Sequence, residues 1–269
     1  MRRLSFPHAF YLLLAMVLVS VTACDDDDDA PACDLSATAT AEAFEINVAA
    51  TGGTAPYRYS IDGENFDSNT RIEVDEATNY TVTVRDANDC EVTVDVTGDN
   101  LDQFTDTRGG TSTTYSVVKI GDQIWLGENL NYITDDDSFC YDDLPANCTE
   151  DGRLYTWDAA REAVPTGWRL PSVSEVQTLI EGLGGEFNAA VAMQPNGSSG
   201  WEEQFAGRYF VSISIYQDQD VNGYYWTSEE EEGDNTEAQA FRVGSGESPS
   251  VRLRDDDKEE RLSVRLIKD

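Results

Sequence analysis

The chain has 269 residues, of which 52 are Asp or Glu and 18 are Lys or Arg, giving a formal net charge of −34. A surface this acidic repels phosphate backbones and anionic lipid headgroups, so we expect no nucleic-acid partner. The single histidine, His8, lies in a segment that we expect to be removed. A mature chain without histidine has neither His-based triads nor His metal sites.

Residues 1–23 have the pattern of a secretory signal. Arg2 and Arg3 precede an apolar stretch at residues 9–21, which is shorter than the roughly 20 residues that a membrane span needs. The stretch ends at Val21-Thr22-Ala23-Cys24, where small residues stand before a cysteine. This ending resembles the lipobox of bacterial lipoproteins, which implies acylation of Cys24 as a membrane anchor. An ordinary signal peptide followed by a disulfide cysteine is the alternative.

Five aspartates, residues 25–29, follow Cys24 directly. Such a charge run is typical of a solvated spacer. Acidic residues next to a lipidated cysteine also resemble the surface-export signal of Bacteroidota lipoproteins. The resemblance implies a lipid-anchored outer-membrane protein exposed at the cell surface, with residues 24–30 as its tether, and the periplasmic face is the alternative. Removal of residues 1–23 leaves 246 residues, a length that suits two domains better than one.

Residues 31–98 show the period-two alternation of β-strands. Turn residues separate the runs at Gly52-Gly53, at Asp62-Gly63 and at residues 86–89. The alternating apolar positions are Phe44, Ile46 and Val48, then Tyr80, Val82 and Val84, and finally Val92, Val94 and Val96. This spacing predicts an all-β immunoglobulin-like sandwich of short strands.

Two segments of this domain resemble the SprB repeat of Bacteroidota gliding adhesins. They are Thr51-Gly-Gly-Thr-Ala-Pro-Tyr-Arg-Tyr-Ser-Ile-Asp-Gly63 and Tyr80-Thr-Val-Thr-Val-Arg-Asp-Ala-Asn-Asp-Cys90. The family has glycine before the cysteine, where this chain has Asp89. Adhesins of this class carry such repeats in long arrays, whereas this chain has one. We therefore interpret the domain as a spacer or a small binding module, and expect Tyr57 and Tyr59 to pack within the strands.

A linker at residues 99–105 leads to a domain at residues 106–269 that combines helices with strands. Gly121-Asp122, flanked by apolar residues, predicts a hairpin turn. Helical spacing covers residues 153–163, and the capping box Ser172-Val-Ser-Glu175 opens a second helix. Strand-like segments follow at residues 208–216, 223–228, 238–243, 250–254 and 262–267. The order of these elements predicts an α+β domain.

The motifs of residues 106–269 resemble the Fibrobacter succinogenes major paralogous domain. The matching motifs are Val118-Lys-Ile-Gly-Asp-Gln-Ile-Trp125, Glu128-Asn-Leu130, Cys140-Tyr-Asp-Asp-Leu-Pro-Ala-Asn-Cys148, Gly152-Arg-Leu-Tyr-Thr-Trp-Asp-Ala-Ala160, Pro165-Thr-Gly-Trp-Arg-Leu-Pro171, Tyr225-Trp-Thr-Ser228 and Ser263-Val-Arg265. The resemblance implies a C-type-lectin-like fold, related to sulfatase-modifying enzymes, on secreted or surface proteins. Members usually have cysteines where this chain has Val164 and Leu266. Their joint replacement predicts that these two residues are neighbours in space.

Four cysteines follow Cys24, namely Cys33, Cys90, Cys140 and Cys148. Three pairings are possible in principle, and pairing within each domain predicts Cys33–Cys90 and Cys140–Cys148. A zinc site is the alternative use of four cysteines, although no Cys-x-x-Cys spacing occurs.

Candidate calcium ligands lie in the second domain. Gln194-Pro195-Asn196 is similar to the Glu-Pro-Asn motif of calcium-dependent sugar-binding lectins, but their Trp-Asn-Asp motif does not occur. The acidic clusters at residues 135–137 and 229–232 offer oxygen ligands without EF-hand spacing. We therefore expect solvated acidic faces and no cofactor, with calcium as the one candidate ion.

Candidate ligand-binding rings are those predicted to be exposed. Trp201 stands in a polar loop, and Tyr224, Tyr225 and Trp226 precede the acidic loop, so we expect these four to form a surface together with Gln194 and Asn196. The remaining tryptophans are predicted to be buried, as most such rings are. They are Trp125, Trp157 and Trp168.

The sequence favours a binding protein over an enzyme. Sulfatase-modifying relatives use reactive cysteines near the end of the fold, whereas the last cysteine here is Cys148. We expect a lectin-like head that binds an extracellular glycan or protein in an adhesion-type role. A purely structural surface protein, or a passenger of a larger complex, is the alternative, and a formylglycine-generating-like enzyme is a third, supported by analogy of fold alone.

Overall fold

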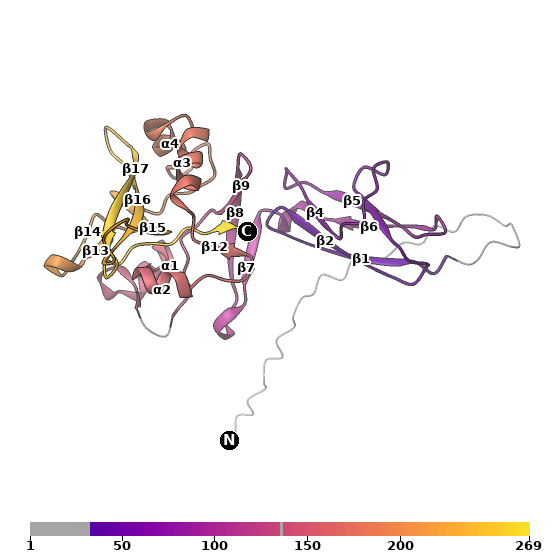
Figure 1. Ribbon diagram of the computed structural model, residues 1–269, viewed down its shortest axis with the longest axis horizontal. Coiled ribbons are helices and arrows are strands. Elements are labelled where there is room, and N and C mark those ends of the chain that lie inside the picture. Colours follow the sequence, from indigo (N-terminus) through magenta and orange to yellow (C-terminus); the bar gives the residue numbers. More distant parts are fainter. Residues whose placement is uncertain (1–32, 135–136) are drawn as a thin grey trace, which may run out of the picture. The chain divides into compact units, whose positions relative to one another are not determined.

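The computed structural model describes residues 33–134 and 137–269 (Figure 1). The predicted signal segment at residues 1–23, the predicted anchor Cys24 and the predicted tether at residues 24–30 lie outside the described residues. The described chain divides into two compact units: the first comprises residues 33–40, 46–72 and 79–97, and the second residues 41–45, 73–78 and 98–269. Both units are rich in β-structure. No helix in the described part of the chain is long and apolar enough to cross a membrane.

The strands of the first unit form two three-stranded sheets, with the strand orders β1-β2-β4 and β3-β5-β6. Their bounds are β1 Ser36–Glu42, β2 Glu45–Thr51, β3 Arg58–Ser60, β4 Arg71–Glu73, β5 Tyr80–Arg85 and β6 Glu91–Val96. The alternation in β5 places Val82 and Val84 in the core, both 0% exposed. Ile46 of β2 is also 0% exposed, so both sheets contribute buried apolar side chains.

A buried aspartate organises the turn before Cys90. Asp86 is 2% exposed, and its carboxylate accepts hydrogen bonds from the backbone N–H groups of Thr54 (2.8 Å) and Cys90 (2.9 Å). These bonds to the charged form, led by that from Thr54, lower the pKa of Asp86. Asp89 has a φ of 62°, a left-handed conformation that glycine adopts most readily. A glycine would therefore suit this position.

Two disulfides confirm the predicted pairing. Cys33 is bonded to Cys90, with Cα atoms 5.8 Å apart, and Cys140 to Cys148, with Cα atoms 4.9 Å apart. Each bridge lies within its own predicted domain. Because all four thiols are used in this way, the zinc interpretation is wrong.

The second unit contains a five-stranded sheet with the order β12-β18-β9-β8-β7. Its strands are β7 Gln103–Asp106, β8 Thr113–Ile120, β9 Gln123–Leu126, β12 Trp168–Arg169 and β18 Ile267–Lys268. Ile120 pairs with Gln123 across Gly121-Asp122, which confirms the predicted hairpin. The last strand of the chain, β18, pairs with both β9 and β12, so the C-terminal segment is an internal strand of this sheet.

A three-stranded sheet, β15-β16-β17, and two short ladders complete the β-structure of the second unit. The bounds are β10 Ser138–Phe139, β11 Leu154–Tyr155, β13 Arg208–Phe210, β14 Ile215–Gln217, β15 Asn222–Glu230, β16 Glu237–Gly244 and β17 Val251–Asp257. β10 pairs with β11, and β13 with β14, both antiparallel.

Two predicted strands differ from the structure. Residues 208–216 form the β13–β14 hairpin and not one strand, because Ser214 adopts a left-handed conformation (φ 55°) that reverses the chain. The segment at residues 262–267 is regular only in β18, while Leu262 and Ser263 form isolated bridges. The alternation of apolar and polar residues therefore continues through positions that are not paired as regular strands.

In its described residues the second unit has four α-helices, α1 Pro145–Asp151, α2 Trp157–Glu162, α3 Val173–Gly182 and α4 Glu186–Met193. Short 3₁₀ turns lie at Gly98–Asn100, Arg108–Gly110, Tyr141–Asp143 and Val211–Ile213. The helix predicted at residues 153–163 begins later, because Leu154 and Tyr155 pair as β11. Thr156 then caps α2 by accepting a hydrogen bond from Ala159 N (3.4 Å). Helices α1 and α4 were not predicted.

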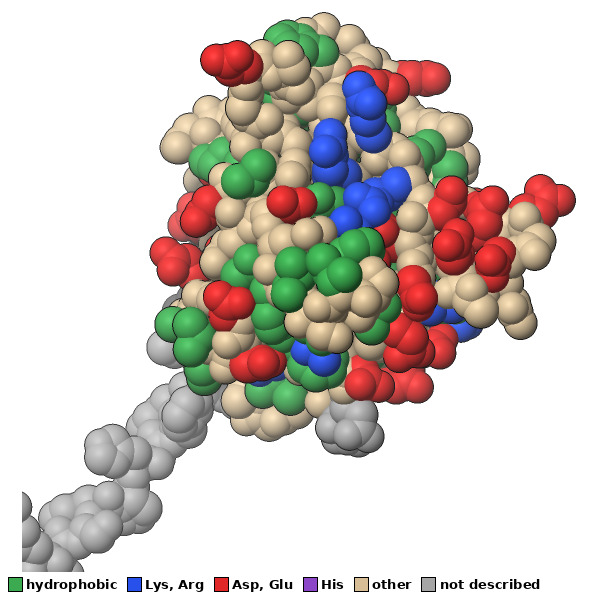
Figure 2. All heavy atoms as spheres, turned by 90° about the vertical axis from the view of Figure 1, so that its left-hand side faces the viewer, with side chains coloured by type: hydrophobic (Ala, Val, Ile, Leu, Met, Phe, Trp, Pro, Cys, Tyr) green, Lys and Arg blue, Asp and Glu red, His purple; other side chains and the backbone are tan. Residues whose placement is uncertain are grey.

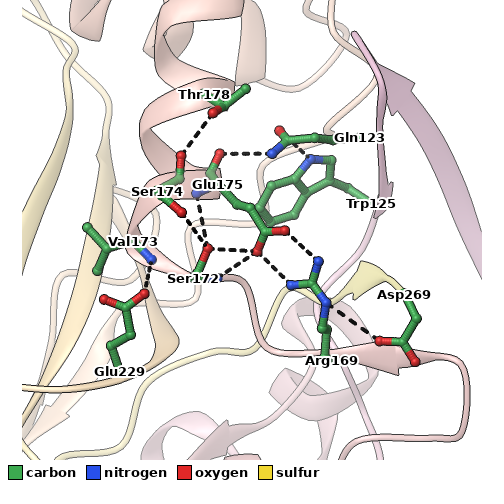
Figure 3. Close-up of polar contacts among 10 residues, drawn as sticks. All are labelled: Gln123, Trp125, Arg169, Ser172, Val173, Ser174, Glu175, Thr178, Glu229 and Asp269. Carbon is green, nitrogen blue, oxygen red and sulfur yellow. Dashed lines mark hydrogen bonds and ion pairs between the residues drawn. The ribbon is translucent and has the colours of Figure 1, made fainter.

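The N-terminus of α3 has the predicted capping box (Figure 3). The Ser172 hydroxyl accepts from the Glu175 N–H (3.2 Å), and the Glu175 carboxylate accepts from the Ser172 N–H (2.8 Å). Arg169 donates to both carboxylate oxygens of Glu175 and lies 3.5 Å from Asp269. The bonds from Arg169 are the main reason that the pKa of Glu175 is lowered to about 2. The cap therefore ties α3 to β12 and to the end of β18.

The main core of the second unit lies between helices α3 and α4 and the sheet β15-β16-β17. Leu179 of α3 and Phe241 of β16 are among its completely enclosed side chains. Trp125, Trp157 and Trp168 are 0%, 3% and 5% exposed, which confirms that these three rings are buried.

Candidate functional site

The aromatic residues predicted to form a ligand surface are buried. Trp201, Tyr225 and Trp226 are 0% exposed and Tyr224 is 3% exposed, so the prediction of exposure is wrong. The physical reason is that side-chain direction does not follow the polarity of sequence neighbours. The Trp201 ring turns inward, with its centroid 5.4 Å from that of Trp125, although Trp201 stands in a polar loop.

The polar atoms of these rings are bonded inside the protein. Trp201 Nε1 donates to Glu203 (3.0 Å), and the Tyr225 hydroxyl donates to the same carboxylate. Arg265 lies over the Trp201 ring at 4.7 Å and donates to Asn129 Oδ1 (2.7 Å). Burial raises the pKa of the Glu203 carboxyl group, against the opposing attraction of Arg265. This network is internal, and we assign it to holding the fold.

Tyr224 marks the boundary between the core and the outer face of the unit. Two guanidinium groups lie close to its ring, with Arg208 at 4.7 Å and Arg254 at 5.0 Å from its centroid. Its hydroxyl donates to Asp218, and burial is the largest cause of its pKa rising to about 12. The ring that was predicted to face a ligand therefore contacts two arginines of the protein itself.

Gln194 and Asn196 lie at the C-terminal end of α4. The Gln194 side chain donates to Ala190 O (2.8 Å) and so bonds back to its own helix. Asn196 is exposed, and its backbone N–H donates to the Glu202 carboxylate at 3.0 Å. Asn196 is therefore bonded to one carboxylate, that of Glu202, whereas the side chain of Gln194 is hydrogen-bonded to its own helix.

The described residues of the acidic cluster at residues 229–232 contact other groups of the same chain. Asp135 and Asp136 lie outside the described residues. In the other cluster, Glu229 accepts from Val173 N (3.0 Å) and Glu230 lies 3.1 Å from the Lys258 ammonium group. Across residues 33–134 and 137–269, no group of three or more His, Cys, Asp or Glu side chains is arranged to hold a metal ion.

Two buried carboxyl groups share one arginine. Arg208 Nη1 donates to Asp256 Oδ1 (3.0 Å) and to Glu260 Oε2 (2.9 Å), and the two acids are 4% and 3% exposed. Burial and then the charge of Asp256 raise the pKa of Glu260 to about 7. Carboxyl pairs hydrolyse glycosides when they face a sugar. This pair faces Arg208 and is shielded from solvent, so its geometry supports a structural role.

A surface of different character lies on the β13–β14 hairpin. The Tyr209 and Tyr216 rings meet edge to face, with centroids 4.9 Å apart. Arg261 lies 4.2 Å from the centroid of Tyr209 and donates to the Tyr216 hydroxyl (2.9 Å). We define the hairpin surface as Phe139, Tyr209, Ile213, Ile215, Tyr216 and Arg261.

The hairpin surface combines half-buried rings with exposed aliphatic side chains. Ile213 is 56% exposed and Ile215 is 45% exposed. Figure 2 shows hydrophobic side chains gathered in the middle of this side of the molecule, with acidic side chains concentrated to one side. Exposed apolar side chains that lie close together on a surface are typical of an interaction site.

Sequence reasoning missed the hairpin surface because the pattern at residues 208–216 predicts a single strand. The alternation Val211-Ser-Ile-Ser-Ile215 was the available signal, since Ile213 and Ile215 of that run are exposed. Arg261 is 45 residues from its partner Tyr216. Only the tertiary fold brings these two side chains together.

A comparison with protein families identifies the second unit. The model of the Fibrobacter succinogenes major domain matches residues 118–268, which is more than half of the chain. No curated protein and no solved structure matches. The matched segment runs from β8 to β18 and contains all four α-helices, both candidate acids of the buried pair and the hairpin surface. The chain therefore belongs to the Fibrobacter succinogenes major domain family.

Proposed function

We propose that this protein is a non-enzymatic, lipid-anchored surface protein whose second unit binds an extracellular protein in an adhesion-type role. The observation that carries the proposal is the composition of the hairpin surface. Ile213 and Ile215 are exposed at the turn of the hairpin, and Tyr209, Tyr216 and Arg261 lie together on one face of its ladder. Tyrosine and arginine are enriched at protein interfaces and at their energetic hot spots.

The aliphatic side chains favour a protein ligand over a neutral sugar. Full burial of an isoleucine side chain contributes roughly 1.5–3 kcal/mol, so burying the exposed half of Ile213 and of Ile215 contributes about 1 kcal/mol each. A partner realises this gain only with a complementary apolar pocket. Protein side chains supply such a pocket more readily than sugar hydroxyl groups do.

The anchor and the architecture belong to the same proposal. The proposed anchor is inferred from Val21-Thr22-Ala23-Cys24. Several acyl groups on Cys24 would be needed, because a single acyl group binds a membrane only marginally. The first unit, with its two three-stranded sheets and its disulfide, is proposed as an SprB-type immunoglobulin-like spacer. The second unit is proposed as a C-type-lectin-like head. Outer-membrane display would direct that head away from the cell.

The non-enzymatic part of the proposal is supported by the state of the candidate reactive groups. Cys140 and Cys148 form a disulfide, and the carboxyl groups of Asp256 and Glu260 are shielded behind Arg208. Formylglycine-type chemistry needs a reactive thiol, and glycoside hydrolysis needs carboxyl groups that reach a substrate. Neither arrangement is available at these residues.

Photo-crosslinking from the hairpin tests the protein ligand. A photoreactive amino acid is placed at Ser212, which is exposed at the hairpin tip, and as a control at Thr178, which is exposed on α3. In cells that carry the full chain, Ser212 is expected to crosslink one extracellular protein that Thr178 does not reach. Absence of crosslinks from Ser212 would contradict the proposal and leave a purely structural surface protein as the better description.

Affinity measurements with the crosslinked partner test the residues. Ile213→Ser combined with Ile215→Ser removes about 2 kcal/mol of burial, equivalent to about a thirtyfold loss of affinity. The matched control changes Phe187 and Val191 to serine, because these side chains of α4 are similarly exposed at 56% and 47%. Equal losses in the two variants would show that the hairpin surface is not the contact.

Acyl labelling and surface proteolysis test the anchor. Incorporation of an alkyne-tagged fatty acid is expected in the wild type and not in Cys24→Ala, while protease added to intact cells is expected to degrade the wild-type chain. Labelling that persists in Cys24→Ala would contradict the anchor. Resistance to protease on intact cells, with degradation after lysis, would place the head on the periplasmic side.

A further inference from the structure

Three arginines lie on the same face of β16 and β17, opposite the face that packs against α3 and α4. In the antiparallel register Arg242 stands directly opposite Arg252, and Ala240 opposite Arg254. Because side chains alternate along a strand, Arg252 and Arg254 project to the same face as Arg242. Phe241 projects to the other face, into the core. We call Arg242, Arg252 and Arg254 the arginine row.

The arginine row is open to solvent. Strand β17 is at the edge of its sheet, Arg252 is exposed, and Arg242 and Arg254 are half-buried. Figure 2 shows a group of Lys and Arg side chains in the upper part of this side of the molecule, with others lower down. Directly opposed residues lie about 5 Å apart and alternate residues of a strand about 7 Å apart, so the row spans on the order of 10 Å.

The positive charge of the row is only partly balanced. Arg252 lies 3.8 Å from Glu186, and both side chains are more than half exposed (66% and 60%), a geometry that contributes little. Among the described residues no ion pair joins Arg242 to a carboxylate, and its guanidinium donates to the Ser250 hydroxyl at 3.2 Å. Arg254 contacts Asp256, an acid that it shares with Arg208.

Opposed arginines are unusual in so acidic a chain. Like charges directly across an antiparallel pair destabilise a sheet, and acidic residues outnumber basic ones by 52 to 18. The chain nevertheless places Arg242 opposite Arg252, and in the described ion pairs only Arg252 of these two lies near a carboxylate, that of Glu186. An anionic ligand would neutralise this repulsion, because two guanidinium forks accommodate an oxyanion with paired hydrogen bonds.

We propose that the arginine row binds an anionic extracellular polysaccharide through its sulfate or carboxylate groups. The negative charge of the protein around the row favours a thin polymer whose anionic groups are spaced apart. A nucleic acid or an anionic bilayer would bring dense charge against the acidic side chains that flank the row, and the net charge of −34 opposes that approach. A polysaccharide presents single anionic groups along a thin chain that can follow the row.

The inference extends beyond the protein ligand of the hairpin surface and uses different residues. None of Arg242, Arg252 and Arg254 belongs to that surface. Failure of polysaccharide binding therefore leaves the crosslinking result from Ser212 unaffected, and failure of the crosslink leaves the arginine row unaffected. The two experiments separate the two ligands.

Binding of defined polymers to the full chain in detergent tests the inference. The immobilised probes are dextran sulfate, polygalacturonate, uncharged dextran and single-stranded DNA of similar length. We expect binding to one or both anionic polysaccharides and none to dextran. The tighter of the two anionic probes identifies sulfate or carboxylate as the recognised group. Raising the salt concentration is expected to weaken the binding, since exposed charge pairs are screened.

A charge-matched pair of variants tests the residues. Arg242→Ser with Arg252→Ser is expected to weaken binding by about tenfold or more. Arg58→Ser with Arg71→Ser removes the same charge from β3 and β4 of the first unit and is expected to change binding by less than about twofold. Arg254 is left unchanged because it contacts Asp256. Unaltered thermal unfolding establishes that both double variants are folded.

Three results would overturn the inference. The first is that neither anionic polysaccharide binds the wild-type chain. The second is an equal loss in the Arg58/Arg71 variant, which would mean that binding depends on overall charge and not on the row. The third is DNA binding of the same strength and the same dependence on Arg242 and Arg252, which would make the row a general polyanion site.

Discussion

Replacing Glu260 with glutamine is expected to stabilise the protein at neutral and alkaline pH. Burial, together with the charge of Asp256, raises the pKa of Glu260 from an ordinary 4.5 to about 7 in the folded chain. Between these two values the folded state holds a proton that the unfolded state has released. Stability therefore falls as the pH rises through this range, because the folded state binds more protons than the unfolded state.

The magnitude follows from the two pKa values. The difference between 4.5 and about 7 corresponds to roughly 3 kcal/mol, at about 1.4 kcal/mol for each pKa unit. Glutamine carries no charge, so Glu260→Gln avoids this loss, but it also weakens the bond that Arg208 makes at 2.9 Å. We expect a net gain of about 1–3 kcal/mol in the free energy of unfolding near pH 8 and almost none near pH 5.

Urea unfolding followed by tryptophan fluorescence measures this effect. All five tryptophans lie in the second unit, so their signal reports the unit that contains Glu260. The control is Glu259→Gln, which removes the same charge from the exposed neighbouring position. The reasoning is refuted if the stabilities of wild type and Glu260→Gln stay parallel from about pH 5 to about pH 8.5, or if Glu259→Gln gives the same gain.

Three further changes have expected outcomes. Double serine substitution of Cys33 and Cys90 is expected to lower the free energy of unfolding by about 4 kcal/mol, and that of Cys140 and Cys148 by about 2.5 kcal/mol. The difference arises because the bridged residues are 57 and 8 positions apart in the sequence. Equal losses in calorimetry would contradict this entropic account. Glu175→Gln is expected to cost roughly 2 kcal/mol near pH 7. Because the pKa of Glu175 is lowered to about 2, this contribution is present above pH 4.5 and is lost as the pH falls toward 2, so a deficit independent of pH would argue against it. Val164→Cys with Leu266→Cys is expected to form a disulfide, and titration of two free thiols would refute the inferred contact.

Local signals explain what the sequence predicts well. The capping box at Ser172 and the turn at Gly121-Asp122 are encoded within four residues each, and tertiary contacts do not override them. Helix α4 was missed because its eight residues are too few to show a full apolar stripe after the glycine pair at residues 184–185. The start of α2 was misplaced because Leu154 and Tyr155 find strand partners that no local pattern reveals.

The candidate site was harder to predict than the fold. Polar neighbours suggested that Trp201 and Tyr225 face solvent, yet Glu203 and Arg265 provide hydrogen-bonding and ring partners inside the core. A buried acid with a raised pKa is visible only when its three-dimensional surroundings are known. The composition of a loop therefore predicts its polarity and not the direction of its largest side chain.

Several residues of the motifs that carry the family resemblance are buried in the second unit. Trp125 and Tyr225 are 0% exposed, and Asn129 bonds to the buried Arg265 at 2.7 Å. The exposed residues of the hairpin surface lie at residues 211–217, and the arginine row lies at residues 242–254. Both segments are outside those motifs. The buried residues of these motifs belong to the scaffold, whereas Ile213, Ile215 and Arg252 are exposed. We therefore expect the two proposed ligands to be recognised by these exposed segments and not by the motifs that carry the family resemblance.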